Sequence, residues 1–229
     1  MEFTKLSNRL DLVASFVPAG ARLLDVGSDH AYLPIALLQE GKIEAAIAGE
    51  VVEGPYQSAL QNVADNGLED KIEVRLANGL TAFEPTDGIS CITIAGMGGR
   101  LIADILAAGL EKLASVSRLV LQPNNREDEL RAWLVDNDFR IVDEAILEEN
   151  EKFYEILVVE QGSQELSAKE LRFGPYLMRE QAPAFVQKWS KEVEKLAFAL
   201  EQVPVENQSA RASLEERIAQ IKEVLNASK

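Results

Sequence analysis

The sequence is nearly devoid of cysteine and histidine, with one of each among 229 residues. A single cysteine excludes a disulfide framework and a cysteine-rich zinc site, and the lone His30 excludes a metal site built from several histidines. We therefore expect no metal. The first residues carry no cationic segment followed by an apolar run, and no apolar stretch approaches the ~18 residues of a membrane span. These absences predict a soluble, cytoplasmic protein with no signal peptide and no membrane partner.

Basic side chains are also scarce. The chain has 23 lysines and arginines against 38 aspartates and glutamates, a net charge of −15. The whole excess lies in residues 1–160, with 13 basic and 28 acidic side chains, whereas residues 161–229 hold ten of each. Neutralisation of phosphates dominates nucleic-acid affinity, so this is not an obvious nucleic-acid binder. A polyanion is therefore expected to contact the neutral C-terminal part or a local basic patch.

The stretch that organises the chain is LLDVGSDHAYLP, residues 23–34. It predicts a buried strand, a turn that begins at Gly27, and a helix with Pro34 in its first turn. A dinucleotide-binding turn needs G-x-G-x-x-G, but Asp29 stands where the second glycine of that pattern would be. The carboxylate of Asp29 would repel a pyrophosphate. It suits a cationic ligand such as S-adenosylmethionine (SAM), which has a sulfonium, an ammonium and no phosphate.

Strand and helix patterns alternate along the first 160 residues. After a helix within residues 6–17 and the strand before Gly27, further strands are predicted within residues 44–51, 71–79, 88–99, 118–125, 139–147 and 153–160. Helices separate most of them, which predicts a doubly wound α/β sheet of seven strands. The acidic turn EENEK joins the last two strands. So short a joint predicts an antiparallel hairpin at one edge.

The pattern changes after residue 160. Apolar residues recur at steps of three and four between residues 185 and 203 and again between 210 and 225, as in a coiled coil. Pro204 lies between the two stripes and predicts an antiparallel helical hairpin. We therefore expect a catalytic domain over residues 1–160 and a helical arm over 161–229. The arm either contacts a partner or packs on the sheet or on a second subunit.

Several motifs together resemble one enzyme family. LLDVGSDHAYLPI, the ANG of residues 77–79, IAGMGG, LQPN and the C-terminal helical arm resemble the bacterial tRNA (adenine-22-N1)-methyltransferases. These are Rossmann-like, class I, SAM-dependent enzymes, and the resemblance runs over essentially the whole chain. It implies the strand order 3-2-1-4-5-7-6, a tRNA substrate and S-adenosylhomocysteine as product. The chain departs from the wider class pattern, D/E-x-G-x-G-x-G, at Asp29 and Ala31.

The first glycine turn is the expected cofactor site. Gly27 lets the backbone pass close to the cofactor, with Ser28, Asp29 and His30 on the turn around it. We expect Asp29 to face the ammonium or the sulfonium. Asp25 is either a further cofactor contact or a structural acid that accepts hydrogen bonds from the loop.

Two later strand ends complete the expected cofactor site. Glu50 lies 23 residues after Gly27, near the ~20-residue spacing of an acid that binds ribose hydroxyls; the alternative is a solvated glutamate. Asn78, with Gly79, could read the edge of adenine, or could form an Asn-Gly turn without a ligand. The second glycine turn should leave room for the cofactor on one side and for a flat base on the other. Its residues are Ala95, Gly96, Met97 and Gly98.

The expected chemistry needs little from the protein. The in-plane lone pair of adenine N1 attacks the sulfonium methyl, so no strong base must act first, and most catalysis is orientation. Asp29 could favour the developing adeninium electrostatically. His30 could hold the base or relay a proton from N6, or simply cap the loop. Asn124, within a motif loosely like N-P-P-Y, is the candidate for the edge of the target base.

Basic residues of the arm are the expected tRNA contacts, with two arginines closer to the pocket. They are Lys188, Lys191, Lys195 and Arg211 on the arm, and Arg9 and Arg100 near the pocket. No obligate protein partner is evident. Two other functions remain open at this point. One is a SAM-dependent enzyme for a protein or a small molecule, which the acidic sheet domain favours, and the other is a non-catalytic binding module.

Overall fold

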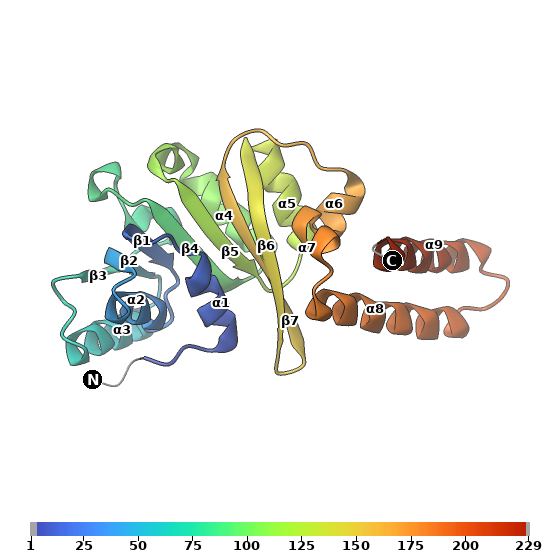
Figure 1. Ribbon diagram of the computed structural model, residues 1–229, viewed down its shortest axis with the longest axis horizontal. Coiled ribbons are helices and arrows are strands. Elements are labelled where there is room, and N and C mark those ends of the chain that lie inside the picture. Colours follow the sequence, from blue (N-terminus) through green and yellow to red (C-terminus); the bar gives the residue numbers. More distant parts are fainter. Residues whose placement is uncertain (1–3, 228–229) are drawn as a thin grey trace.

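Seven strands form one sheet in the order β3-β2-β1-β4-β5-β7-β6 (Figure 1). The computed structural model describes residues 4–227. The strands are β1 (Ala21–Val26), β2 (Ile43–Glu50), β3 (Ile72–Leu76), β4 (Cys91–Met97), β5 (Arg118–Pro123), β6 (Phe139–Glu149) and β7 (Lys152–Gln161). The first five are parallel, and β7 runs antiparallel to both β5 and β6. The predicted Rossmann-like order is confirmed.

Helices cover both faces of the sheet, because strand side chains alternate between the two. In β1, Leu23 packs in the cluster that contains α1 and α2 side chains, whereas Leu24 packs with Ile102 and Leu130 from the opposite layer. One layer holds α1 (Asn8–Phe16), α2 (Tyr32–Gln39) and α3 (Glu53–Asp65), and the other holds α4 (Gly99–Ala108) and α5 (Glu127–Asp136). Short 3-10 helices are η1 (Gly79–Ala82), η2 (Pro85–Asp87) and η3 (Leu110–Ser115).

The β6–β7 hairpin is antiparallel as predicted, but its turn is shorter than the five residues EENEK. The two strands pair from Phe139 with Gln161 to Glu149 with Lys152. Only Asn150 and Glu151 remain between them, both left-handed, with φ of 52° and 63°. Two left-handed residues match the twist of a two-residue hairpin, so the strands continue to the turn itself.

In the described part of the chain four helices follow the sheet, and the last two form the predicted antiparallel hairpin, which projects beyond it (Figure 1). Two short helices not expected from the pattern seat this arm on the sheet. Ile146 of β6 packs there against Phe173, Leu177, Phe185 and Trp189. The four helices are α6 (Ala168–Phe173), α7 (Pro175–Glu180), α8 (Pro183–Gln202) and α9 (Gln208–Asn226).

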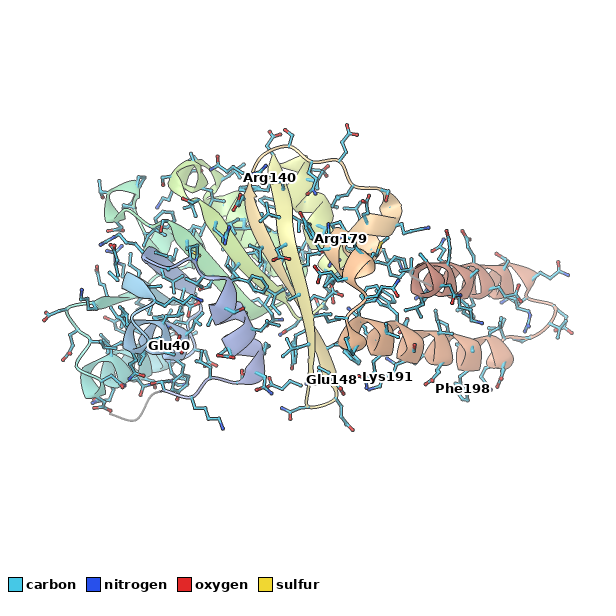
Figure 2. All side chains as sticks on the ribbon, in the orientation of Figure 1. Glu40, Arg140, Glu148, Arg179, Lys191 and Phe198 are labelled. Carbon is cyan, nitrogen blue, oxygen red and sulfur yellow. The ribbon has the colours of Figure 1, made fainter. Side chains whose placement is uncertain are left out.

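The arm is held together by a narrow apolar stripe. Leu196 of α8 and Ile221 of α9 are buried in one cluster, while Phe198 lies on the side of α8 that faces away from α9 and is 66 % exposed (Figure 2). At the outer end, Arg211 donates from Nη1 to the carbonyls of Leu200 and Val203 at distances of 3.1 and 3.0 Å. Leu200 lies in the last turn of α8 and Val203 is its C-cap residue, so Arg211 caps that helix. Each helix found among residues 4–227 is too short or too polar to span a bilayer.

Candidate active site

The turns expected to bind the cofactor lie at one edge of the sheet. Val26 at the end of β1 is in register with Gly49 of β2 and Ile94 of β4, and Met97 of β4 with Pro123 of β5. Parallel strands in register bring their carboxyl ends together. Asp29, Glu50, Gly96 and Asn124, which lie at the strand ends or in the loops after them, therefore surround one region.

The first turn adopts a backbone that its sequence does not predict. Asp29, His30 and Ala31 are left-handed in succession, with φ of 46°, 71° and 61°. Such residues cost about 1–3 kcal/mol each and persist where the surroundings hold them. Here the N–H groups of Gly27 and Ser28 donate to the Gly49 carbonyl at 2.8 and 3.2 Å. The turn thus has the left-handed backbone that is typical of a glycine-rich loop, although Asp29 and His30 stand where glycine is usual.

The backbone of this turn offers hydrogen-bond donors. Within residues 4–227, the N–H groups of Asp29, His30 and Ala31 donate to no acceptor. The His30 carbonyl accepts from Asn62 Nδ2 at 3.0 Å, which ties the turn to α3. The Asp29 side chain is 82 % exposed, and its Oδ1 lies 3.5 Å from His30 Nε2. The turn can therefore present free N–H groups and a carboxylate to one ligand.

Asp25 is buried behind this turn. Its Oδ1 accepts a hydrogen bond of 2.6 Å from the hydroxyl of Thr93. Burial raises the pKa of Asp25 to about 7; the Thr93 hydrogen bond lowers it, and the charges of Glu50 and Asp29 raise it further. The carboxyl is therefore poised to ionise when positive charge arrives nearby.

Glu50 is buried at the end of β2, beside the first turn. Its Oε1 accepts a hydrogen bond of 2.6 Å from the Ser28 hydroxyl, which leaves Oε2 for another donor. Asn78 follows β3 and is exposed. Its backbone N–H donates a hydrogen bond of 3.1 Å to the Thr81 hydroxyl. Gly79 is left-handed, with φ of 56°, and a Cβ there would lie 3.0 Å from Ile105. These residues share the edge with the first turn.

The second glycine turn packs closely against the loop after β5. A Cβ on Gly99 would lie 2.5 Å from the Arg126 carbonyl oxygen, so this position has no room for a side chain. Gly96 is exposed and left-handed, with φ of 79°. Asn124 is exposed, and its Nδ2 donates to the Gly96 carbonyl at 2.7 Å. The amide of Asn124 is thus fixed beside the second glycine turn, with Ala95, Met97 and Gly98 around it.

The predicted RNA contacts separate into two groups. Lys188 is largely buried and pairs with Glu127 and Glu155 at 2.9 and 2.7 Å. Arg211, as described, caps α8. Both side chains are therefore occupied by internal contacts. The other four residues are more available: Lys195 and Arg100 are exposed, and Lys191 and Arg9 are half-buried.

A groove of about 810 Å³ connects Asn124 to the arm. The aromatic side chains of Phe153, Tyr154 and Trp189 line it, together with cationic and acidic groups. Lys191 Nζ lies 5.0 Å from the Phe153 ring centroid and 3.7 Å from Glu148, which Figure 2 shows beside it at the base of the arm. The cationic side chains on the groove are Lys152, Arg172, Lys188, Lys191, Lys195 and Arg217.

Sequence reasoning missed three of these cations and the burial of one amide. Lys152, Arg172 and Arg217 lie on three different elements, so no sequence pattern brings them together. Gln122, expected with the other residues of LQPN to form the wall of the pocket, is instead fully buried at the end of β5. The available signal for Gln122 was its position directly after the apolar run of residues 119–121, where a strand is still buried.

The chemistry of the donor set fits SAM. Three acids, Asp25, Asp29 and Glu50, meet at the edge and suit a cationic ligand without phosphate. A Cβ on Gly27 would lie 2.5 Å from the Met97 methyl, so the two glycine turns are adjacent. Within residues 4–227, no three His, Cys, Asp or Glu side chains are placed to hold a metal ion.

Comparisons with known proteins agree with this arrangement. A family model described as tRNA (adenine(22)-N(1))-methyltransferase, TrmK, matches residues 23–223. The tRNA (adenine(22)-N(1))-methyltransferase of Bacillus subtilis is 41 % identical over 238 aligned residues, covering 99 % of each chain. A putative tRNA methyltransferase of Mycoplasma genitalium is 29 % identical and covers 68 % of each.

Solved structures extend the agreement to the whole fold. The Bacillus subtilis TrmK crystal structure has a TM-score of 0.86 at 39 % identity, covering 97 % of this chain and 100 % of that one. A Streptococcus pneumoniae relative in complex with SAM has a TM-score of 0.90 at 65 % identity, with the same coverage. The expected family, enzyme class and cofactor are thereby confirmed. The chain belongs to the tRNA (adenine(22)-N(1))-methyltransferases, class I enzymes that use SAM.

Proposed function

We propose that this protein transfers a methyl group from SAM to N1 of adenine 22 in the D-loop of tRNA. Family membership over nearly the full chain supports the reaction. One structural observation carries the site: the acidic left-handed turn at Asp29 and the amide of Asn124 lie at the same edge, where the groove toward the arm begins. A cationic cofactor and a base can meet there.

The cofactor is proposed to lie across the first turn. Glu50 Oε2 would accept from the ribose hydroxyls, because Oε1 already accepts from Ser28. The free N–H groups at Asp29 and His30 would bind the methionine carboxylate, and Asp25 would favour the positive charges. Asn78 and Gly79 would contact the adenine, and Ala95, Gly96, Met97 and Gly98 would form the opposite wall.

The reaction then depends on alignment. SAM, when bound, supplies an electrophilic methyl on its sulfonium. Asn124 would hold the edge of the target base, and Asp29 would favour positive charge as it develops on the adenine ring. Adenine N1 lies on the pairing edge, so the base must leave any pair or stack before it reaches this edge. Orienting two bound reactants accounts for most of the rate enhancement.

The arm is proposed to bind the tRNA through the groove. Lys191 and Lys195 of α8 face it, and Arg9 and Arg100 lie closer to the edge. Lys152, Arg172 and Arg217 join them in place of Lys188 and Arg211, whose charges serve internal contacts. We retain the division into a catalytic part over residues 1–160 and an arm over residues 161–229 as part of this proposal.

The defining experiment is methyl transfer from labelled SAM to unmodified tRNA, followed by digestion and identification of the nucleoside. We expect N1-methyladenosine, and we expect it to disappear when adenine 22 is changed. SAM binding without labelled RNA would contradict the substrate. Proteins and small molecules would then be screened as acceptors, and failure to bind SAM would point to a non-catalytic module.

The groove makes a prediction about tRNA affinity. Replacing Lys195 and Arg217 together with glutamine should raise the KM for tRNA about tenfold and reduce the slope of log affinity against log salt by roughly 2. SAM affinity should not change. Both cations lie near Glu192, at 3.9 and 3.6 Å, so Glu192→Gln should act in the opposite direction. Lys71→Gln, at the other end of the sheet, is the neutral control. If it weakens tRNA binding as much as the double variant does, the groove is not the tRNA-binding surface.

Asp25 makes a prediction about pH. Its pKa is about 7, so the carboxyl is partly protonated at neutral pH. Because the positive charges of SAM favour the carboxylate, SAM should bind more tightly as pH rises. Between about pH 6 and pH 8 the affinity of the wild type should rise roughly tenfold relative to Asp25→Asn, because the ligand's own ionisation affects both proteins alike. Folding stability should change in the opposite sense: the folded form holds a proton that the unfolded form releases near its ordinary pKa, so this contribution falls as pH rises toward 7. Calorimetric measurement of SAM affinity between about pH 6 and pH 8 checks the binding prediction. If the affinities of the wild type and Asp25→Asn depend on pH in the same way, the prediction is wrong.

A further inference from the structure

Gln122 uses all of its hydrogen-bonding capacity at the edge of the candidate site. Its Oε1 accepts from Arg9 Nη1 at 2.6 Å and from the Gly96 N–H at 3.0 Å. Its Nε2 donates to the Pro123 carbonyl at 2.8 Å and to Asn124 Oδ1 at 3.2 Å. A glutamine amide has two acceptor positions and two N–H groups, so all four are occupied. The side chain is fully buried and joins α1, β4 and the loop after β5.

This arrangement determines the polarity of the Asn124 amide. Oδ1 of Asn124 faces the Nε2 of Gln122, and its Nδ2 faces the Gly96 carbonyl at 2.7 Å. A flipped amide would place its oxygen against the carbonyl of Gly96 and its N–H group against another donor. Among the described residues, one N–H group of Nδ2 and one lone pair of Oδ1 remain free. Their directions are fixed by the hydrogen bonds to Gln122 and Gly96.

The same glutamine orients Arg9. The guanidinium of Arg9 is held by Gln122 and lies 5.6 Å from the centroid of the Tyr154 ring. Within residues 4–227, no carboxylate lies within ion-pair distance of it, although this part of the chain is acidic. Arg9 is therefore a fixed cation near the groove, with donors left for a phosphate.

We propose that Gln122 is a positioning residue for the target nucleotide: it sets the direction of the Arg9 guanidinium and the polarity of the Asn124 amide together. A nucleotide held by its phosphate at Arg9 and by its base at Asn124 then has one placement relative to the second glycine turn. This inference rests on the proposed function, since it assigns both groups to the RNA substrate.

Gln122→Glu is the diagnostic variant, because it keeps the shape and the acceptor for Arg9. The new oxygen faces the carbonyl of Pro123 and Oδ1 of Asn124, so the Asn124 amide must turn. We expect kcat on tRNA to fall at least tenfold while SAM affinity changes less than twofold. Gln39→Glu is the matched control: Gln39 also joins a backbone N–H and an asparagine, Thr4 and Asn66, but far from this edge.

A double-mutant cycle separates positioning from a merely structural role. In an Asn124→Ala background, Gln122→Glu should lower kcat less than twofold, because no amide remains to be turned. An equal loss in both backgrounds, or a parallel loss of SAM affinity, would overturn the inference. If the wild type itself does not methylate adenine 22, the proposed function fails instead, so the two failures are distinguishable.

Discussion

Replacing Arg131 with methionine should lower the free energy of unfolding by about 3–5 kcal/mol, the largest stability effect that we expect from a single side chain. Arg131 is fully buried. Its Nε donates to Glu144 at 2.8 Å, one Nη binds Glu155, and the other donates to the Leu171 carbonyl at 3.1 Å. Methionine fits the apolar part of the site but leaves two buried carboxylates without their guanidinium.

The effect should be large because Arg131 joins many elements. Glu144 Oε2 also accepts the Tyr176 N–H at 2.9 Å at the start of α7, and Glu155 also binds Lys188 of α8. A Cβ on Gly174 would lie within 2.8 Å of both Glu144 and Arg131, so the chain passes against this cluster. The network therefore seats the arm on the sheet, and its loss should reduce tRNA methylation more than SAM binding.

Urea unfolding with linear extrapolation measures this loss. Arg140→Met is the matched control, because Arg140 is half exposed on the same sheet and pairs with Glu160 at 3.2 Å (Figure 2). Exposed pairs contribute about 0–1 kcal/mol. If both variants lose the same small amount, the buried network does not stabilise the fold in the way argued.

The pH dependence of the loss tests its cause. Burial raises the pKa of Glu144 despite Arg131; for Glu155 burial acts in the same sense, but Arg131 and Lys188 outweigh it and lower its pKa. Without Arg131 both pKa values should rise above those of the unfolded chain. The folded variant then holds extra protons, so its deficit should shrink from about pH 8 to about pH 5.5. A deficit independent of pH would indicate lost packing alone.

Asp29→Asn should lower kcat about 100-fold, equivalent to about 2.7 kcal/mol of transition-state stabilisation. Asp29 is the acid on the left-handed turn, and in the proposed reaction positive charge moves past it from the sulfonium to the adenine ring. The amide keeps the shape but not the charge. Asparagine tolerates left-handed backbone as well as aspartate does, so the turn should retain its path.

Single-turnover methylation and SAM calorimetry separate the two roles expected for Asp29. A charge that acts on the ring lowers the chemical rate, whereas one that faces only the ammonium weakens SAM binding. Asp138→Asn is the matched control, since Asp138 is also left-handed, with φ of 60°, but lies in the turn before β6. Unchanged turnover in Asp29→Asn with intact SAM binding would remove Asp29 from the mechanism.

Local sequence patterns determined most of the elements. Alternation and apolar runs located the strands, and the stripes after residue 183 located α8 and α9. These features depend on neighbours a few residues apart, so the pattern contains them. The strand order did not follow from pattern; it came from the family resemblance. The two short helices α6 and α7 carry no stripe long enough to predict.

One feature of the candidate site depended on long-range contacts. The left-handed run at Asp29, His30 and Ala31 has no local signal, because glycine is the residue that normally marks such backbone. The Gly49 carbonyl, which accepts from the Gly27 and Ser28 N–H groups, and Asn62 Nδ2, which donates to the His30 carbonyl, hold this turn from 20 and more residues away along the chain. The placement of these site residues as ligand contacts stays a prediction.

Charged residues show the division between sequence and tertiary structure most clearly. By sequence, Arg131 sits in an ordinary amphipathic helix and Lys188 on the arm belongs to a basic patch. In the fold Arg131 pairs with Glu144 and Glu155 of the β6–β7 hairpin. Lys188 pairs with the same Glu155 and with Glu127 of α5. Apolar periodicity reports which face of an element is buried, and the sequence by itself therefore determined the sheet, the arm and the glycine turns. Which charges pair depends on how separate elements pack, and only the tertiary structure decided that.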